Sequence, residues 1–185
     1  DHPTRDFTEA PALSEAECAR AMAYGMMAVE DGIDALCLGE MGIGNTTSAA
    51  ALCCGMFGGA AADWVGAGTG VAGAALRRKT EIVAKGVALH RTALEDPFEV
   101  LRRLGGHELA AVAGAILAGR IARVPVILDG YACTAAAAIL YRADQSALDH
   151  CIVGHLSVEP GHARLIDAIG KQPVLSLGMR LGEAS

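Results

Sequence analysis

Several polar side chains stand directly after short apolar runs of this chain. Glu40 comes after the run 35–38, Asp129 after the run 124–128, and Ser157 after the run that begins at residue 151. The carboxyl edge of a parallel sheet is where α/β proteins bind ligands, so such positions are candidates for a site. A carboxylate there can accept hydrogen bonds from ribose hydroxyls, and a serine hydroxyl can donate to a phosphate. For Asp129, the alternative that it only caps the following helix carries equal weight.

The segment 39–47 contains three glycines and precedes an alanine-rich run. Gly42 and Gly44 permit tight backbone turns, and we expect Asn45 or Thr46 to cap the helix that follows. Exposed N–H groups at the start of a helix, together with the helix dipole, favour an anion such as a phosphate. The pattern is only moderately specific, because the same glycines can simply form a tight turn between a strand and a helix.

A second glycine loop, residues 66–70, precedes a long helical pattern that contains Lys79. Leu76 and Val83, neighbours of Lys79 at helical spacing, are apolar, so its ammonium group does not belong to the polar stripe of that helix. Lys79 therefore either extends along the helix to reach water or projects into a cleft as a partner for a phosphate.

The histidines and cysteines predict no metal site. His155 and His162 lack the spacing of two ligands on one helix, and the six cysteines include no Cys-x-x-Cys pair. We expect no metal, no cofactor and no disulfide framework. We interpret the cysteines as small buried apolar residues of a protein in a reducing compartment.

The composition excludes two classes of protein. The 185 residues carry a formal net charge of −6 and only 4% aromatic residues, which argues against nucleic acid as a partner. The apolar stretches are too short for a membrane span, and the first residues lack the basic and apolar regions of a signal peptide. We therefore expect a cytoplasmic protein without a membrane span.

The apolar pattern indicates the elements that position these residues. Ser14 and Glu17 form a capping-box pattern that predicts a helix to about Glu30, ended by Gly32. Further helices are predicted over 46–54, 71–94, 97–104, 107–122, 135–141 and 160–169, and strands over 35–38, 124–128 and 151–153, with 174–177 as a last strand or a loop. The strands lack alternation, which is typical of strands buried on both faces of a parallel sheet. This order predicts one α/β domain over residues 1–185, with a doubly wound parallel sheet.

The segment 39–47, Gly-Glu-Met-Gly-Ile-Gly-Asn-Thr-Thr, resembles the signature of the nicotinate-nucleotide:dimethylbenzimidazole phosphoribosyltransferase family, which activates the lower ligand of cobalamin. The segments 1–4, 8–12, 128–130, 159–162 and 179–183 also look like family segments, in family order. The resemblance covers nearly the whole chain. It implies a Rossmann-like parallel sheet with helices on both sides, part of a smaller helical domain from the chain ends, and a homodimer. It also implies that the chain is a fragment, without the family's N-terminal part and C-terminal helices.

The resemblance further implies the reaction and the roles of matching residues. Phosphoribosyl transfer from nicotinate mononucleotide to 5,6-dimethylbenzimidazole would give α-ribazole 5′-phosphate and nicotinate. Glu183 matches the general base that takes the proton of the incoming dimethylbenzimidazole, and Arg180 is a neighbour of Glu183. The other implied substrate-binding positions are the ribose-site carboxylate Glu40, the close backbone at Gly42 and Gly44, the phosphate-side residues Lys79 and Ser157, and the site-edge carboxylate Asp129.

Two other functions compete with this interpretation. A dinucleotide-dependent (NAD) oxidoreductase would need a third glycine at Rossmann spacing, which the loop of Gly42 and Gly44 lacks. A non-catalytic module that binds a phospho-sugar or nucleotide would explain the glycine loops and Lys79. This alternative would not explain a role for Arg180 and Glu183.

Overall fold

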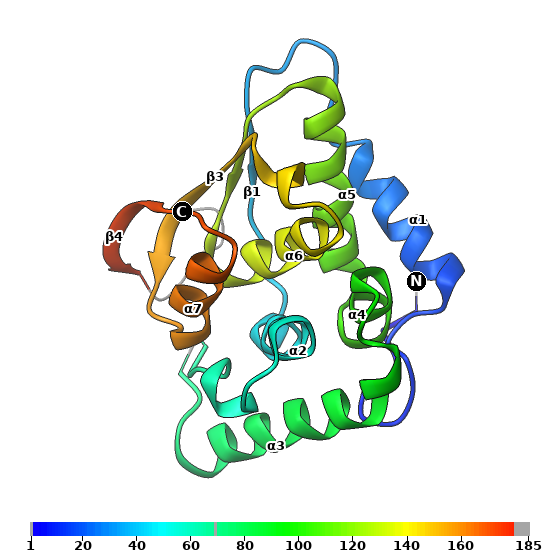
Figure 1. The fold of residues 1–185 in the computed structure, drawn as a ribbon, viewed down its shortest axis with the longest axis vertical. Coiled ribbons are helices and arrows are strands. Elements are labelled where there is room, and N and C mark those ends of the chain that lie inside the picture. Colours follow the sequence, from blue (N-terminus) through cyan, green and yellow to red (C-terminus); the bar gives the residue numbers. More distant parts are fainter. Residues whose placement is uncertain (1, 69, 180–185) are drawn as a thin grey trace.

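The computed structural model describes residues 2–68 and 70–179, in which four parallel strands form one sheet with helices around it (Figure 1). The strands are β1 (Leu36–Leu38), β2 (Val126–Leu128), β3 (Cys151–Ser157) and β4 (Pro173–Met179). The helices are α1 (Glu15–Met26), α2 (Asn45–Phe57), α3 (Gly73–His90), α4 (Pro97–Leu104), α5 (His107–Ala122), α6 (Gly130–Ala143) and α7 (Pro160–Ala168). The expected class, an α/β fold with a parallel sheet flanked by helices, is confirmed.

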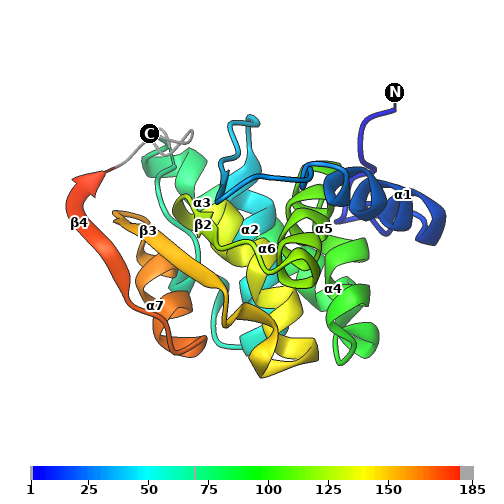
Figure 2. The same ribbon diagram turned by 90° about the horizontal axis from the view of Figure 1, so that it is seen from above.

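The strands follow one another in the order β1-β2-β3-β4. This order does not reverse among the described strands, so the reversal point of a doubly wound sheet is not among them. Crossover connections between parallel strands are almost always right-handed. When the strand order does not reverse, this places the connecting helices on the same face of the sheet, and α6 and α7 both pack against β3. Figure 2 shows α7 below β3, with β4 at the outer edge.

Burial of the strands differs from the expectation of two covered faces. Val126 and Leu128 are buried on the face of α6. The other face of the sheet carries a row of paired residues on β1, β2 and β3: Cys37, Ile127 and Ile152. Of these, Cys37 and Ile152 are exposed. The expectation that all six cysteines are buried was therefore wrong for Cys37, because the described helices between the strands cover the opposite face of the sheet.

The alanine-rich helix α6 forms the centre of the core. Its residues 135–138 are fully buried, and their small side chains allow α2, α5 and β3 to approach closely. Trp64, Leu52 and Ile116 are among the largest side chains that fill the remaining space. Although α5 and α6 are largely apolar, no helix in the described part of the chain is long and apolar enough to cross a membrane.

The boundaries of several elements differ from the predictions. The capping box of Ser14 and Glu17 is present, but α1 ends at Met26, before the predicted Glu30. The helix predicted over 71–94 is α3 followed by a separate 3₁₀ turn, Arg91–Ala93. Helix α6 begins at Gly130 rather than residue 135, because burial of this segment outweighs the weak helix propensity of its first residues. Strand β3 continues to Ser157, and residues 173–179 are a strand.

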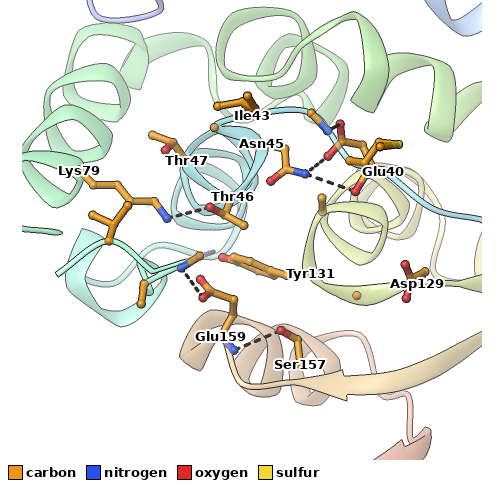
Figure 3. A pocket seen from close by; sticks show the side chains of 18 of the residues that line it. Glu40, Ile43, Asn45, Thr46, Thr47, Lys79, Asp129, Tyr131, Ser157 and Glu159 are labelled. Carbon is orange, nitrogen blue, oxygen red and sulfur yellow. Dashed lines mark hydrogen bonds between the residues drawn. The ribbon is translucent and has the colours of Figure 1, made fainter. Parts of the chain in front are cut away.

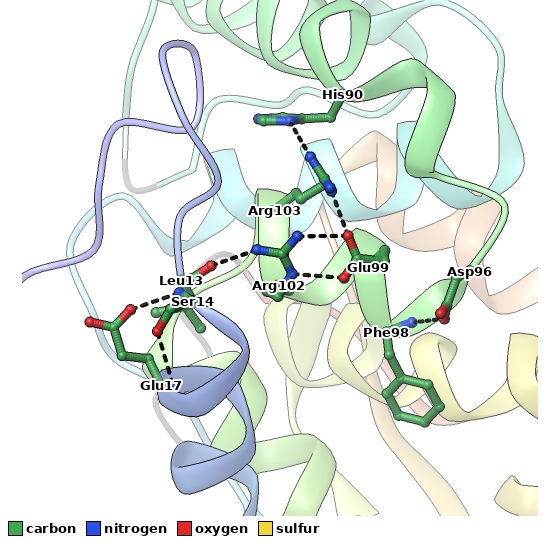
Figure 4. A network of polar contacts seen from close by, with 9 residues as sticks. All are labelled: Leu13, Ser14, Glu17, His90, Asp96, Phe98, Glu99, Arg102 and Arg103. Atoms are coloured by element: carbon green, nitrogen blue, oxygen red, sulfur yellow. Dashed lines mark hydrogen bonds and ion pairs between the residues drawn. The ribbon is translucent and has the colours of Figure 1, made fainter.

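A polar network joins the segment before α1 to helix α4 (Figure 4). The guanidinium group of Arg102 donates two hydrogen bonds to the carboxylate of Glu99 and one to the carbonyl oxygen of Leu13. Arg103 also donates to Glu99, and the two arginines lower the pKa of Glu99 to about 2. The backbone N–H of Leu13 donates to the carbonyl oxygen of Arg102. The chain before α1 is thus anchored to α4.

Candidate active site

A cavity of about 320 Å³ lies where β1, β2 and β3 end (Figure 3). Residues 40–47 line it after β1, residues 129–132 after β2, and His155, Ser157 and Glu159 at the end of β3. Among its lining residues are six of the positions expected from the sequence: Glu40, Gly42, Gly44, Lys79, Asp129 and Ser157. Two other expected positions, Arg180 and Glu183, lie outside the described residues.

The N-terminus of α2 lies in the wall of this cavity. Gly44 precedes the helix with a φ of 87°, a left-handed conformation that glycine adopts without strain. No side chain in the described part of the chain caps α2, so the expected cap by Asn45 or Thr46 was wrong. Both side chains have other partners: Asn45 donates to Glu40, and Thr46 accepts from Lys79. The positive end of the helix dipole therefore faces the cavity.

Glu40 shapes the loop between β1 and α2. One carboxylate oxygen accepts a hydrogen bond from the backbone N–H of Gly42 at 2.6 Å, and the other accepts from the side-chain amide of Asn45. A Cβ at Gly42 would lie 2.5 Å from the first of these oxygens, so a side chain there would displace the carboxylate of Glu40. Burial raises the pKa of Glu40, although the Gly42 N–H opposes the shift. Both oxygens of Glu40 are thus already engaged within its own loop.

Lys79 joins the two glycine loops. Its ammonium group donates to the Thr46 hydroxyl oxygen at 2.8 Å and to the carbonyl oxygen of Gly66 at 2.9 Å. The residue is 8% exposed and lines the cavity, so the alternative that it reaches bulk water was wrong. Burial lowers the pKa of Lys79, and the nearby carboxylate of Glu159 opposes that shift. An ammonium has three N–H groups, and the third has no partner among the described residues.

Glu159 is a buried carboxylate in this wall that the sequence analysis did not single out. Its Oε1 accepts from the backbone N–H of Gly68 at 2.7 Å, which holds the second glycine loop against the start of α7. Its Oε2 is buried without a hydrogen-bond partner in the described part of the chain, and a Cβ at Gly66 would lie 2.4 Å from it. The signal available in the sequence was its place just before Pro160, at the first turn of a helix.

Asp129 and His155 form a buried pair at the ends of two neighbouring strands. Oδ1 of Asp129 lies 3.1 Å from Nδ1 of His155. Asp129 stands at the N-cap position of α6, yet its side chain makes no capping hydrogen bond. The helix-cap alternative is thus right about the position of Asp129, but its side chain does not cap the helix and pairs with His155 instead. Among the residues described, no group of three or more His, Cys, Asp and Glu could hold a metal ion.

Comparison with known proteins identifies the family. A family model described as "Phosphoribosyltransferase" matches residues 1–185. A curated nicotinate-nucleotide–dimethylbenzimidazole phosphoribosyltransferase from Sinorhizobium medicae (strain WSM419) is 62% identical over all 185 residues. The chain belongs to this family. A relative of the same name from Rhizobium rhizogenes (strain K84 / ATCC BAA-868) is also 62% identical over the whole chain, which spans 55% of the length of each of these relatives.

Solved structures of the family have the same fold. The crystal structure of CobT from Thermus thermophilus superimposes with a TM-score of 0.91 and 40% sequence identity, over 97% of this chain and 55% of that one. A second structure from the same organism, described as the nicotinate-nucleotide–dimethylbenzimidazole phosphoribosyltransferase, gives a TM-score of 0.88 at 38% identity, over 97% of this chain and 54% of that one. The family resemblance seen in the sequence is confirmed, and this chain spans about half the length of these relatives.

Proposed function

We propose that this chain forms the nucleotide site of an enzyme that transfers the phosphoribosyl group of nicotinate mononucleotide to 5,6-dimethylbenzimidazole. The observation that supports it most directly is one cavity in which an uncapped helix N-terminus and a buried lysine lie beside carboxylates. The cationic part suits a phosphate, and the polar groups at the strand ends suit a ribose. The names of the relatives support the same choice of substrates.

The phosphate would bind between the two glycine loops. The ammonium group of Lys79 has one N–H available there, the positive end of the α2 dipole faces the same space, and Ser157 lines the same cavity. Hydrogen bonds from charged donors to phosphate oxygens are shorter and stronger than neutral ones. Burial strengthens the attraction further, because little water is present to screen it.

The reaction depends on the orientation of the two substrates and on stabilisation of the charge on the ribose more than on a reactive side chain. A lone pair of the incoming benzimidazole forms a bond to the ribose C1′, while the bond from C1′ to the nicotinate nitrogen breaks and its electron pair neutralises the pyridinium. The proton on the other nitrogen of the benzimidazole then becomes acidic. We propose Glu183 as the base that takes it, with Arg180 positioning that carboxylate, a role worth roughly 10²- to 10⁴-fold in rate. Because the pyridinium is a good leaving group, this step needs no Lewis acid.

We further propose that the protein acts as a cytoplasmic homodimer and does not bind nucleic acid. The acidic net charge of −6 supports the second part of this proposal. Sedimentation of the purified chain, alone and with a DNA duplex, tests the dimer and the absence of nucleic-acid binding. A monomer at every concentration contradicts the dimer, and co-sedimentation with DNA contradicts the absence of nucleic-acid binding.

Product analysis tests the proposed reaction. The chain, and a version extended at both ends to the length of its relatives, are incubated with nicotinate mononucleotide and dimethylbenzimidazole. We expect the extended protein to release nicotinate and form α-ribazole 5′-phosphate in equal amounts. Tight nucleotide binding without product in both proteins would favour the non-catalytic binding module. Reduction or oxidation of an added nicotinamide dinucleotide would favour the oxidoreductase instead.

A further inference from the structure

His155 lies in the wall of the cavity. The residue is only 3% exposed, yet it is one of those that line the cavity. Its Nδ1 faces the carboxylate of Asp129 at 3.1 Å. Because an ionised carboxylate only accepts hydrogen bonds, Nδ1 must carry the proton of the neutral ring. Nε2 has no hydrogen-bond partner among the described residues, and in this tautomer it is an acceptor.

The neighbouring His162 has the opposite tautomer. The backbone N–H of Ser157 donates to Nδ1 of His162 at 3.0 Å, so its proton lies on Nε2. Nε2 then donates to the hydroxyl oxygen of Thr134 at 3.0 Å, and that hydroxyl donates to the carbonyl oxygen of Gly130. Burial lowers the pKa of His162 to about 3, so its ring is neutral. His162 is therefore a satisfied structural residue, and His155 is the histidine that a ligand can reach.

Gly130 keeps Nε2 of His155 accessible. Gly130 lines the cavity with a φ of 64°, and a Cβ built on it would lie 3.7 Å from Nε2 of His155. A side chain at position 130 would thus cover this nitrogen. The backbone of α6 begins here without one, which leaves room beside Nε2 on the cavity side.

We propose that Nε2 of His155 accepts a hydrogen bond from a ribose hydroxyl of the bound nucleotide, with Asp129 as the positioning residue. This inference rests on the proposed function. The ribose hydroxyls are the hydrogen-bond donors of nicotinate mononucleotide at neutral pH, because its carboxylate and phosphate are ionised acceptors and its pyridinium has no N–H. Both oxygens of Glu40 already accept hydrogen bonds within their own loop. His155 is thus a second ribose contact that requires no rearrangement.

The tautomer can be tested without any ligand. Nitrogen-15 spectra of the histidine rings at pH 8, assigned with single His→Gln variants, should show His155 protonated on Nδ1 and His162 protonated on Nε2. His155 protonated on Nε2, or on both nitrogens, would overturn the inference, because Nε2 would then be a donor.

The contact between the ribose hydroxyl and His155 can be tested by removing either the hydroxyl or the imidazole. Titration calorimetry compares nicotinate mononucleotide with its 2′-deoxy and 3′-deoxy analogues. For the wild-type chain we expect one analogue to bind about 3- to 12-fold more weakly, the effect of one hydrogen bond. His155→Phe should bind the natural nucleotide more weakly by a similar factor and should lose the discrimination against that analogue. His155→Gln, which retains an acceptor, should keep part of the discrimination.

Two further variants separate this contact from a change in folding. Asp129→Asn keeps the side-chain volume but replaces an acceptor-only carboxylate by an amide that can turn either its oxygen or its N–H toward Nδ1 of His155, so the tautomer is no longer fixed and the discrimination should weaken. His107→Gln, at the start of α5 and outside the cavity, should retain it. If His155→Phe and Asp129→Asn both discriminate as the wild type does, the inference is wrong.

The outcomes also separate this inference from the proposed function. Unchanged discrimination in the His155 variants, with normal product formation, overturns the inference and leaves the proposed function intact. Binding of ribose 5-phosphate but not of nicotinate mononucleotide would remove the proposed function. If discrimination between ribose 5-phosphate and its deoxy analogues is then lost in His155→Phe, the role of His155 is still supported. A lower turnover in His155→Phe at full hydroxyl discrimination would mean that Nε2 serves the N–H of the benzimidazole, which contradicts the inference.

Discussion

Lys79 combines burial, a positive charge and two neutral hydrogen-bond acceptors. A charge in such a place is costly unless it has a partner. The carboxylate of Glu159 acts on Lys79 through its charge but forms no ion pair with it in the described structure. A bound phosphate would provide the missing partner. This is why the lysine is the first residue at which the proposed site should be tested.

Lys79→Met should weaken binding of nicotinate mononucleotide by about 10- to 100-fold, the loss of one charge-assisted hydrogen bond. The methionine keeps most of the buried stem, so we expect a much smaller change in the melting temperature. Lys85→Met, on an exposed part of the same helix, is the matched control. Unchanged affinity of Lys79→Met in titration calorimetry would remove Lys79 from the phosphate site.

The same lysine predicts opposite responses of binding and stability to pH. Burial lowers the pKa of Lys79, so the unfolded chain binds this proton more tightly than the folded chain. Between the lowered pKa and the ordinary lysine value, folding stability should therefore rise with pH, while phosphate affinity should fall as the ammonium loses its charge. Both slopes are measured as differences between the wild type and Lys79→Met. Slopes of equal sign would contradict this account.

Glu183 is predicted to act on the transition state rather than on nucleotide binding. Glu183→Gln keeps the size of the side chain and removes the base. In the protein extended at both ends, we expect a fall of roughly 10²- to 10⁴-fold in kcat with nearly unchanged nucleotide affinity. Arg180 variants should lose less. Wild-type turnover of Glu183→Gln together with an inactive Glu40→Gln would exchange the roles of the two carboxylates.

At the scale of elements, helices α1 and α5 touch through their backbones. A Cβ at Gly114 of α5 would lie 1.9 Å from the carbonyl oxygen of Met22, and one at Gly25 of α1 would lie 1.8 Å from that of Ala111. Backbone atoms cannot move aside as a flexible side chain can. The glycines therefore set the distance between these two helices.

Gly114→Ala should destabilise the fold by about 1–3 kcal/mol, the usual cost of overpacking, even though alanine is the better helix former. Gly55→Ala in α2 is the control, because its Cβ would meet only the ends of leucine and valine side chains, at 3.1 Å or more. Urea unfolding measures both variants. Equal effects of the two substitutions would show that the backbone contact between α1 and α5 does not limit their approach.

At the scale of the whole molecule, the described helices leave part of one face of the sheet open, where Cys37 of the edge strand β1 and Ile152 of β3 are exposed. Cys37 is exposed there, whereas the other five cysteines are buried. Burial also raises the pKa of Cys53 and of Cys151 to about 12, so these thiols stay protonated at neutral pH. A reactive thiolate is therefore expected at position 37 alone.

A thiol reagent at pH 7.5 should modify one of the six cysteines rapidly in the native chain and all six after denaturation. Cys37→Ser should remove the rapid phase. Rapid modification of two or more thiols in the native chain would contradict the burial of the core, and none would contradict the open sheet face.

The sequence by itself determined the α/β class, the family, and which strand ends carry polar side chains. These features depend on local patterns: glycine loops, apolar runs and a capping box are read over a few neighbouring residues. The same patterns placed Glu40, Gly42, Gly44, Lys79, Asp129 and Ser157 at loops or helices that the structure brings to one cavity. The direction of Lys79 and the partner of Asp129 stayed undecided, since each depends on residues distant along the chain.

Only the tertiary structure decided these long-range contacts. Lys79 turns inward because Thr46 and Gly66 provide acceptors from two other segments. Asp129 pairs with His155 because β2 and β3 are neighbours that end at the same edge of the sheet. The burial of Glu159 and the accessible Nε2 of His155 likewise arise where three strand ends meet. Such contacts depend on distances between elements, and a local pattern contains no information on those distances.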